Sequence, residues 1–256
     1  MKFLIICTEP GGKTSRVFDR MGVDYEYVAC SCSKAKFEGF PTRFYECCGK
    51  HGSNIARRNA LEMGDCVVFD DDYESFVGMG MFGSGISTIK IFDKDLFSQI
   101  LEGMKEIEKR WEKVIVGGYS AGAPCGVENR AKQNIMQIFL SGKIEKFFRK
   151  DSDLYRNNDD VCACIMAKRR GYATYGLWSI IRAVQTPEGK DNTNRYDKRS
   201  YAKSFLPVLY APTCAKVVWC SEKRLSGGKI RPGRFHHKID WIKLTPKMVE
   251  RSKDGK

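Results

Sequence analysis

The chain has 256 residues, of which 42% are hydrophobic and 12% aromatic, so it can bury a substantial core and is not disordered along its length. Lys and Arg number 44 against 31 Asp and Glu, a formal charge of +13. The excess is regional, because residues 1–160 contain 23 basic and 24 acidic residues whereas residues 161–256 contain 21 and 7. This basic last third favours a polyanionic partner such as nucleic acid, and general solubility is the plain alternative.

Hydrophobic runs are too short for a membrane span, which needs roughly 20 apolar residues. The opening MKFLIICTEP is typical of a buried strand rather than a signal peptide. Eleven cysteines, an odd number in a long chain without an export signal, favour reduced thiols and a cytoplasmic location. An alternative is a zinc site, although the paired C-x-x-C pattern is absent. Its ligands would come from Cys30, Cys32, Cys47, Cys48 and His51.

Strands and helices alternate in the first 70 residues. Residues 2–7 (KFLIIC) predict a strand, the breakers TEPGGK follow, and helical spacing continues through Phe18 and Met21. DYEYVAC predicts a second strand, and SNIARRNALEMG a helix that begins at Ser53 or Asn54 and stops at Gly64. CVVF is the next strand. This order indicates an α/β sheet with parallel pairs.

Further along, we expect an amphipathic helix from about 94 to 112, a strand in KVIVGGYS, a helix over 129–141 and another from Asp159 to Arg170, closed by Gly171. From about residue 182 the pattern loosens into polar and basic segments. We therefore predict a core over residues 1–180 and a basic C-terminal segment over 181–256.

The sharpest motif is CVVFDDDYE, which places three carboxylates at the end of a predicted central strand. Ligand sites of open α/β sheets form there. In an extended segment Asp70 and Asp72 point to the same side, so together they can hold a divalent cation. The plain alternative is an acidic turn with solvated charges.

The helix before this strand carries Arg57, Arg58 and Asn59. A guanidinium and a metal ion can together clamp a sugar diphosphate. The whole segment IARRNALEMGDCVVFDDD resembles nucleotide-sugar glycosyltransferases of the GT-A fold, in which an Arg-Asn pair precedes the strand that bears the D-x-D motif. Arg58, Asn59 and Asp70 to Asp72 match those positions. An exposed helix face is the alternative for the two arginines.

Two later segments extend the resemblance. FFRKDSDLYRNNDDVCACIMAKRRG is similar to the family's later acidic motif, with Asp159 and Asp160 in the matching positions. GGKIRPGRFHHKIDW places His236 and His237 beyond a basic, glycine-rich loop. The family brings a C-terminal histidine to the metal, which implies that role for His236 or His237. It also lays a basic loop on the diphosphate, and the matching residues here are Lys229, Arg231 and Arg234.

The combination RN, DDD, NDD and HH in a small basic chain is most similar to the phage glycosyltransferases that accompany TET-type base oxygenases. These enzymes glycosylate hydroxymethylated pyrimidines in DNA, which implies DNA as the acceptor and the host cytoplasm as the compartment. Aromatic side chains among the basic residues can stack on an extruded base, although most of them are expected in the core. They are Tyr172, Tyr175, Trp178, Tyr196, Tyr201, Trp219, Phe235 and Trp241.

The resemblance therefore implies a GT-A (Rossmann-like) fold with a mixed, mainly parallel sheet. It implies Mn²⁺ or Mg²⁺ held by Asp72 with Asp70, a UDP-sugar donor, and no membrane partner. Asp160 or Asp159 would take the proton of the acceptor hydroxyl. The nucleoside contacts would follow the first strand, at Thr8, Glu9 and Arg16.

Other functions remain open at this stage. KVIVGGYSAGA contains G-x-S-x-G, so a serine hydrolase would use Ser120 with Asp160 and His236. A glycosyltransferase with a non-DNA acceptor and a non-catalytic nucleic-acid-binding protein are further alternatives. The sequence leaves open the sugar, the stereochemistry of transfer, the choice between hydroxymethylcytosine and hydroxymethyluracil, and the oligomeric state.

Overall fold

The structure is a computed structural model. It describes residues 2–46, 53–62, 66–82, 85–91, 93–120, 138–140, 159–183, 203–224, 228, 230–244 and 246–247. For some residues inside these helices and strands, only the backbone is described. No helix in these ranges is long and apolar enough to cross a bilayer.

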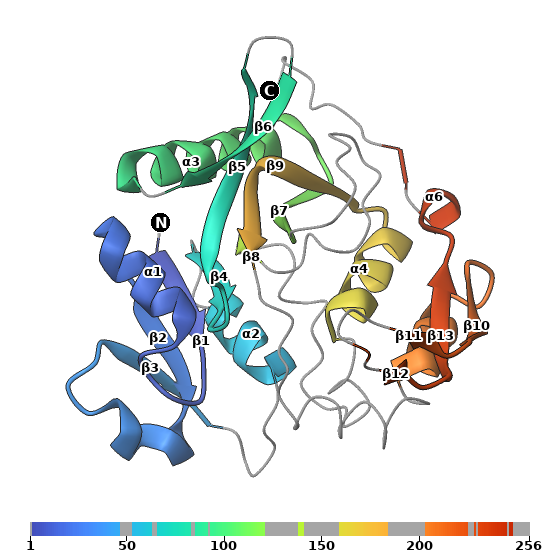
Figure 1. The fold of residues 1–256 in the computed structure, drawn as a ribbon, viewed down its shortest axis with the longest axis horizontal. Helices are drawn as coiled ribbons and strands as arrows, with labels where there is room; N and C mark the ends of the chain where they lie inside the picture. The colour runs from blue at the N-terminus through green and yellow to red at the C-terminus, as the bar shows by residue number, and fades with distance from the viewer. Residues whose placement is uncertain are drawn as a thin grey trace.

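The first half of the chain alternates strands and helices (Figure 1). The elements are β1 (Lys2–Ile6), α1 (Lys13–Met21), β2 (Glu26–Cys30), the 3₁₀ helix η1 (Ser31–Phe37), β3 (Thr42–Tyr45), α2 (Ser53–Glu62), β4 (Cys66–Asp70), β5 (Ser75–Phe82), β6 (Gly85–Ile91) and α3 (Lys94–Arg110). The predicted strands and helices up to residue 110 are confirmed wherever the structure describes them. The β5–β6 hairpin was not predicted.

The second half contains β7 (Val114–Ser120), β8 (Ile138–Leu140), α4 (Asp159–Arg169), β9 (Ala173–Ala183), a helical segment at 203–210, β10 (Ala215–Cys220), β11 (Lys223–Arg224), β12 (Ile230–Arg231), β13 (Arg234–Ile239) and α6 (Trp241–Leu244). The prediction of a helix over 129–141 is wrong for residues 138–140, which form a strand, while 129–137 lie outside the described residues. The apolar triplet Ile138–Leu140 fits either a helix or a strand until it finds pairing partners on both sides.

One nine-stranded sheet organises the molecule, in the order β3-β2-β1-β4-β8-β7-β9-β5-β6. Its first four strands are all parallel. β8 runs antiparallel between β4 and β7, β9 is parallel to β7, and the β5–β6 hairpin is antiparallel to β9. The prediction of an α/β fold with a mixed sheet is thereby confirmed, with four parallel and four antiparallel strand pairings among the described residues. Outside this sheet, β10 pairs with β13 and β11 with β12.

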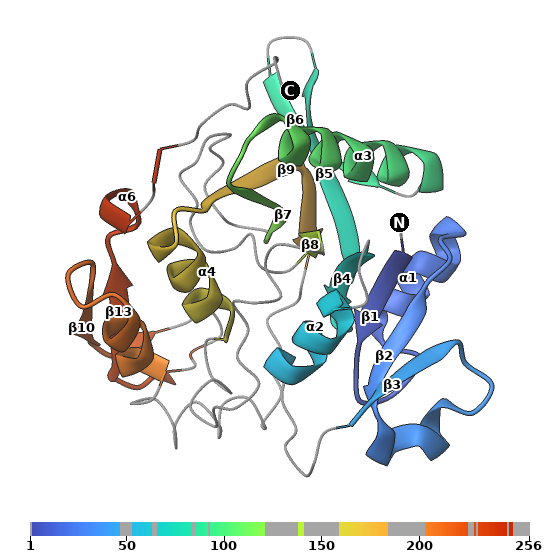
Figure 2. The same ribbon diagram turned by 180° about the vertical axis from the view of Figure 1, so that it is seen from behind.

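Helices cover both faces of the parallel strands, as Figures 1 and 2 show from opposite sides. Alternate residues of a strand point to opposite faces, so buried parallel strands read as continuous apolar runs. Ile5 and Phe69 accordingly pack in a cluster with α1 and α3 through Phe18 and Phe97. The opposite face packs against α2 and α4 in a second cluster. Its members include Leu4, Ile6, Val68, Ala56, Ala60, Ala163 and Cys164.

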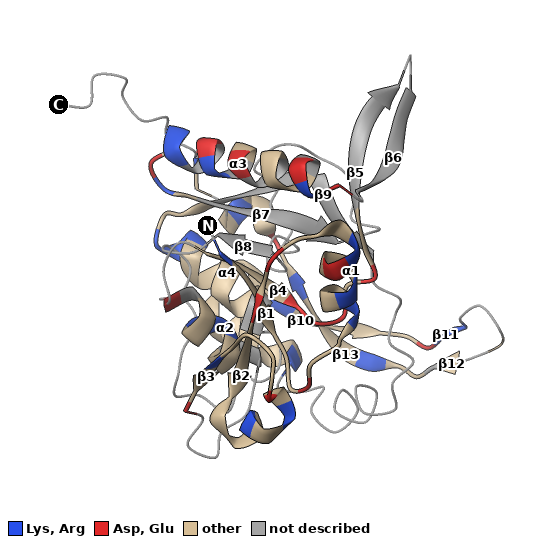
Figure 3. Ribbon diagram, turned by 90° about the vertical axis from the view of Figure 1, so that its left-hand side faces the viewer, with Lys and Arg blue, Asp and Glu red and all other residues tan. Residues whose placement is uncertain are grey.

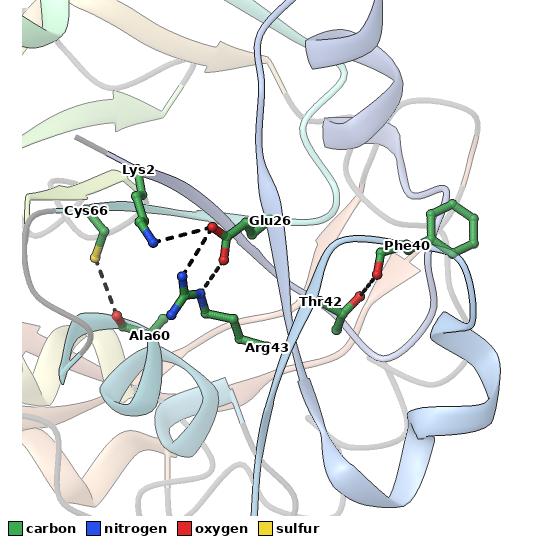
Figure 4. A network of polar contacts seen from close by, with 7 residues as sticks. All are labelled: Lys2, Glu26, Phe40, Thr42, Arg43, Ala60 and Cys66. Atoms are coloured by element: carbon green, nitrogen blue, oxygen red, sulfur yellow. Dashed lines mark hydrogen bonds and ion pairs between the residues drawn. The ribbon is translucent and has the colours of Figure 1, made fainter.

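Polar contacts join neighbouring elements of the sheet (Figure 4). Glu26 on β2 receives Lys2 from β1, with Nζ to Oε1 at 3.5 Å, and Arg43 from β3. The Cys66 thiol donates to the carbonyl of Ala60 at 3.4 Å, which ties the end of α2 to β4. The three parallel edge strands are therefore joined by charge as well as by the backbone ladder.

Candidate functional site

The strand order places a switch point between β1 and β4. From β1 the chain moves outward through β2 and β3, then returns to pair β4 on the other side of β1. In open α/β sheets, ligands bind outside the carboxyl ends of the strands at such a point. The register pairs Ile6 with Asp70, so both strands end at the same level. The β1–α1 loop and the acidic turn after β4 consequently leave the sheet side by side.

The loop and the acidic turn are held together by α1. The Thr14 hydroxyl donates to the carbonyl of Asp70 at 2.5 Å and accepts from the amide of Tyr73 at 3.0 Å. The Thr14 amide donates to the carbonyl of Asp71 at 3.2 Å. Thr14 and Tyr73 are both fully buried. One side chain on α1 thus fixes both ends of the turn that carries the three aspartates.

Two close approaches complete this junction. A Cβ at Gly12 would lie 2.8 Å from the carbonyl oxygen of Asp71, so only glycine fits at the N-cap of α1. The amide of Gly11, which has a φ of 76°, donates to the hydroxyl of the buried Tyr27 at 3.1 Å. The sequence did not identify Gly11, Gly12, Thr14 or Tyr27 as site residues. The breaker cluster EPGGK marks the two glycines, and no local pattern marks Thr14 or Tyr27.

Negative charge is concentrated in the turn. β4 ends at Asp70, and Asp71 and Asp72 lie in a turn. The premise of an extended segment through Asp72 is therefore wrong, because the chain bends to meet α1. Burial, followed by the charges of Asp70 and Asp72, raises the pKa of Asp71 to about 6. Burial and the Asp71 charge raise the pKa of the neighbouring Cys7 thiol to about 12. Asp72 turns one carboxylate oxygen, Oδ1, into the protein interior.

The basic helix α2 contributes Arg57 to this turn. Arg57 is 8% exposed, and its Nη2 donates to Oδ1 of Asp70 at 2.6 Å. Arg58 extends along the helix instead, with Nε 2.9 Å from Oε1 of Glu62. The Asn59 amide donates to the carbonyl of Ile55 in the same helix. Both members of the predicted pair, Arg58 and Asn59, therefore make contacts within α2. The neighbouring Arg57 is the arginine that reaches the acidic turn.

The predicted nucleoside contacts lie on the rim. Thr8, Glu9 and Arg16 are exposed, and Glu9 accepts a 2.6 Å hydrogen bond from Lys36 on η1, which lowers the pKa of Glu9. Arg16 lines an open cleft of about 620 Å³ beside the acidic turn. Lys13 and Glu74, paired at 2.5 Å, join α1 to the segment after β4 across this cleft. Asp19 and Arg20 complete the described lining.

The histidine pair lies elsewhere. His236 and His237 are on β13, on the far side of α4 from β4 in Figure 1. Their ring centroids are 4.4 Å apart. Burial, followed by the charges of Arg234 and Lys203, lowers the pKa of His236. Burial, followed by His236 and Lys203, lowers the pKa of His237 to about 4. The pKa of each imidazole therefore lies below its usual value, and β13 lies away from the acidic turn that follows β4 (Figure 1).

Other predicted residues are placed only in part. Asp159 and Asp160 begin α4, but their side chains are not described, and neither are those of Arg231 and Ser120. Ser120 ends β7. Lys229 lies outside the described residues, as do Cys47, Cys48 and His51 of the possible zinc set. Within the described part of the chain, no three His, Cys, Asp or Glu side chains gather as a metal site.

Comparison of the chain with models of known protein families and with curated proteins gave no match. The function is therefore argued from the geometry at the ends of β1 and β4.

Proposed function

We propose that the protein is a metal-dependent glycosyltransferase of the GT-A fold that moves a sugar from a UDP-sugar to a hydroxymethylated pyrimidine in DNA. One observation carries the proposal: three carboxylates follow the central strand β4 at the switch point with β1, flanked by an arginine of α2 and by the basic helix α1. The motif order that resembles the phage enzymes supports the substrate class. The four parallel strands β3, β2, β1 and β4 are consistent with the Rossmann-like part of the GT-A expectation.

The residues of the turn suit a divalent cation. Burial, followed by the charges of Asp70 and Asp72, raises the pKa of Asp71 to about 6, and a bound cation would offset the repulsion among the three carboxylates. Asp72, with Asp70, would hold Mn²⁺ or Mg²⁺, oxygen-liganded ions that suit carboxylates. When bound, such an ion neutralises a diphosphate and stabilises the charge on it as it leaves the sugar.

The donor would lie across the ends of β1 and β4. Arg57 holds Asp70 in place through its 2.6 Å contact, and a planar guanidinium at this position can also bind a phosphate oxygen. The exposed residues Thr8, Glu9 and Arg16 would contact the nucleoside. Arg58, Asn59 and the basic loop with Lys229, Arg231 and Arg234 would add contacts to the diphosphate. Asp160 or Asp159 would accept the proton of the hydroxymethyl group.

The acceptor proposal rests on charge and on one aromatic ring. Residues 203–247 hold ten Lys and Arg against two Asp and Glu. Figure 3 shows basic segments on β13 and on β11. On β10 the Trp219 side chain is 60% exposed, packed edge-on against Phe235 at 5.1 Å between ring centroids. An exposed, anchored tryptophan among cations is suited to stack on a nucleic-acid base.

The decisive experiment measures sugar transfer by Asp72→Asn. Labelled UDP-sugars are offered with Mn²⁺ to duplex DNA that contains hydroxymethylcytosine or hydroxymethyluracil. We expect transfer to fall by at least about 100-fold in Asp72→Asn, because a metal ligand is lost, while affinity for DNA stays within about twofold. Asp24→Asn is the matched control, since Asp24 is a fully exposed carboxylate paired only with Lys94 among the described contacts.

Three outcomes would reject the proposal. Sugar transfer by Asp72→Asn at the rate of the unchanged protein would show that Asp72 is not a metal ligand. DNA binding that weakens steeply with salt, with no transfer and no stabilisation by UDP and Mn²⁺, would indicate a binding protein. Esterase activity that disappears in Ser120→Ala would indicate a serine hydrolase. Transfer to a free sugar or protein, with none to modified DNA, would keep the donor site and replace the acceptor.

A further inference from the structure

Two cysteine sulfurs lie unusually close together at the end of β2. Cys30 is the last residue of β2 and Cys32 the second residue of η1. Their Sγ atoms are 2.8 Å apart, and the Cys32 amide donates to the Cys30 sulfur at 3.4 Å. A disulfide has an S–S distance of about 2.05 Å, so the two sulfurs need to approach by only about 0.8 Å to bond.

The pair is accessible from one side. Cys30 is 6% exposed, whereas Cys32 is an exposed residue. Ser31, between them, donates its hydroxyl to Glu46 at 2.8 Å, so the backbone at this bend is anchored to the end of β3. The same 3₁₀ helix carries Lys36, which holds Glu9 of the β1–α1 loop. A solvent-borne reagent therefore meets Cys32 first and finds Cys30 directly behind it.

A second C-x-C in the chain shows that spacing alone does not create this arrangement. Cys162 and Cys164 lie on α4 and are both fully buried. Residues two apart on an α-helix do not face each other. Cys164 packs against the sheet in the cluster with Leu4 and Val68, while Cys162 packs with Leu206. The chain thus contains a comparison pair with the same spacing, in which the two cysteines are buried in different clusters.

We propose that Cys30 and Cys32 are a reversible disulfide site that reacts with low-molecular-weight disulfides, a property beyond the proposed glycosyl transfer. The Cys32 thiolate attacks one sulfur of RSSR, forms a mixed disulfide and expels RS⁻. The Cys30 thiolate then attacks the Cys32 sulfur, forms the intramolecular bond and expels the second RS⁻. The two cysteine protons end on the two released thiols, so the protein loses two electrons to RSSR.

Peptide mapping of the full, folded chain tests this. Protein treated with a metal chelator is incubated with oxidised glutathione, quenched with iodoacetamide and digested with trypsin. Residues 21–34 then form one peptide with Cys30 and Cys32, and residues 157–168 form another with Cys162 and Cys164. We expect peptide 21–34 to become lighter by two hydrogens at least about tenfold faster than peptide 157–168, and dithiothreitol to reverse the change. In urea-unfolded protein, the two rates should converge.

Several results would overturn the proposal. Two alkyl groups or two glutathionyl groups on peptide 21–34 after oxidation would contradict it, and so would a cross-link to peptide 44–50. Equal oxidation rates for both C-x-C peptides in the folded protein would contradict it as well. Single variants test the order of attack. Cys30→Ser should accumulate one glutathionyl group on Cys32, whereas Cys32→Ser should react at least about tenfold more slowly because Cys30 is buried. Equal rates in the two variants would contradict Cys32 as the entry thiol.

Discussion

The Thr14 hydroxyl should contribute strongly to the stability of the acidic turn. Its hydroxyl is buried between the carbonyl of Asp70 and the amide of Tyr73, at 2.5 and 3.0 Å. Thr14→Val keeps the shape of the side chain and removes both hydrogen bonds. Each backbone group that loses its partner inside the protein costs about 1–3 kcal/mol, so the free energy of unfolding should fall by about 2–6 kcal/mol.

Thr14→Ser is the matched control, because it keeps the hydroxyl and loses one methyl group, at a cost of about 1 kcal/mol. Guanidinium unfolding at pH 7 measures both variants, with an unchanged slope as the check that the same transition is compared. Values for the two variants within about 0.5 kcal/mol of each other would refute the reasoning, since the hydroxyl would then contribute nothing. If the proposed function holds, Thr14→Val should also weaken the stabilisation by UDP and Mn²⁺.

Three further predictions use the same unfolding assay. Arg57→Ala should lower the free energy of unfolding by about 2–4 kcal/mol, because the half-buried Asp70 carboxylate loses its ion pair with Arg57. Arg58→Ala breaks a surface ion pair with Glu62 and should lower it by about 0.5 kcal/mol. Gly12→Ala should cost about 1–3 kcal/mol through its close approach to the acidic turn, while Gly103→Ala, on the open face of α3, should gain about 0.5–1 kcal/mol. Burial lowers the pKa of Lys168 from 10.5 to about 8. The free-energy cost of burying the charged Lys168 side chain is therefore complete below pH 8 and disappears as the pH rises to 10.5. Lys168→Met should therefore stabilise by up to about 3 kcal/mol near pH 7 and by less near pH 10; an equal gain at both pH values would contradict the assignment.

The sequence predicted the elements whose apolar pattern is long and regular. β1, β2 and β4 are continuous apolar runs, and α1 to α4 have helical spacing with clear stops, such as Gly171 with its φ of 84°. The sequence did not predict the strands that form only by pairing with strands distant in the chain. β8 has three residues, and only its neighbours β4 and β7 make it a strand. The glycine-rich β5–β6 hairpin and the short strands after residue 203 are of the same kind.

The charged residues of the candidate site were predicted from the sequence, but the contacts between them were not. Three aspartates after an apolar run are visible in the sequence, and so is the pair of arginines before it. Which arginine reaches the turn depends on how α2 is rotated against the sheet, and the structure turns Arg57 inward and leaves Arg58 beside Glu62. Thr14 lies 56 residues from its partner Asp70, and no local pattern reports such a contact.

The two C-x-C segments show in physical terms why a motif needs its secondary structure. At the end of β2 the chain bends into a 3₁₀ helix, and the Cys32 amide turns back to the Cys30 sulfur, which brings the two side chains together. On α4 the same spacing advances the chain by just over half a turn, so Cys162 and Cys164 enter different clusters. The same argument applies to DDD: the course of the chain through the three aspartates depends on the turn that Thr14 and Gly12 contact, not on three aspartates being consecutive. A variant that loosens the bend should therefore impair the site while every carboxylate remains present.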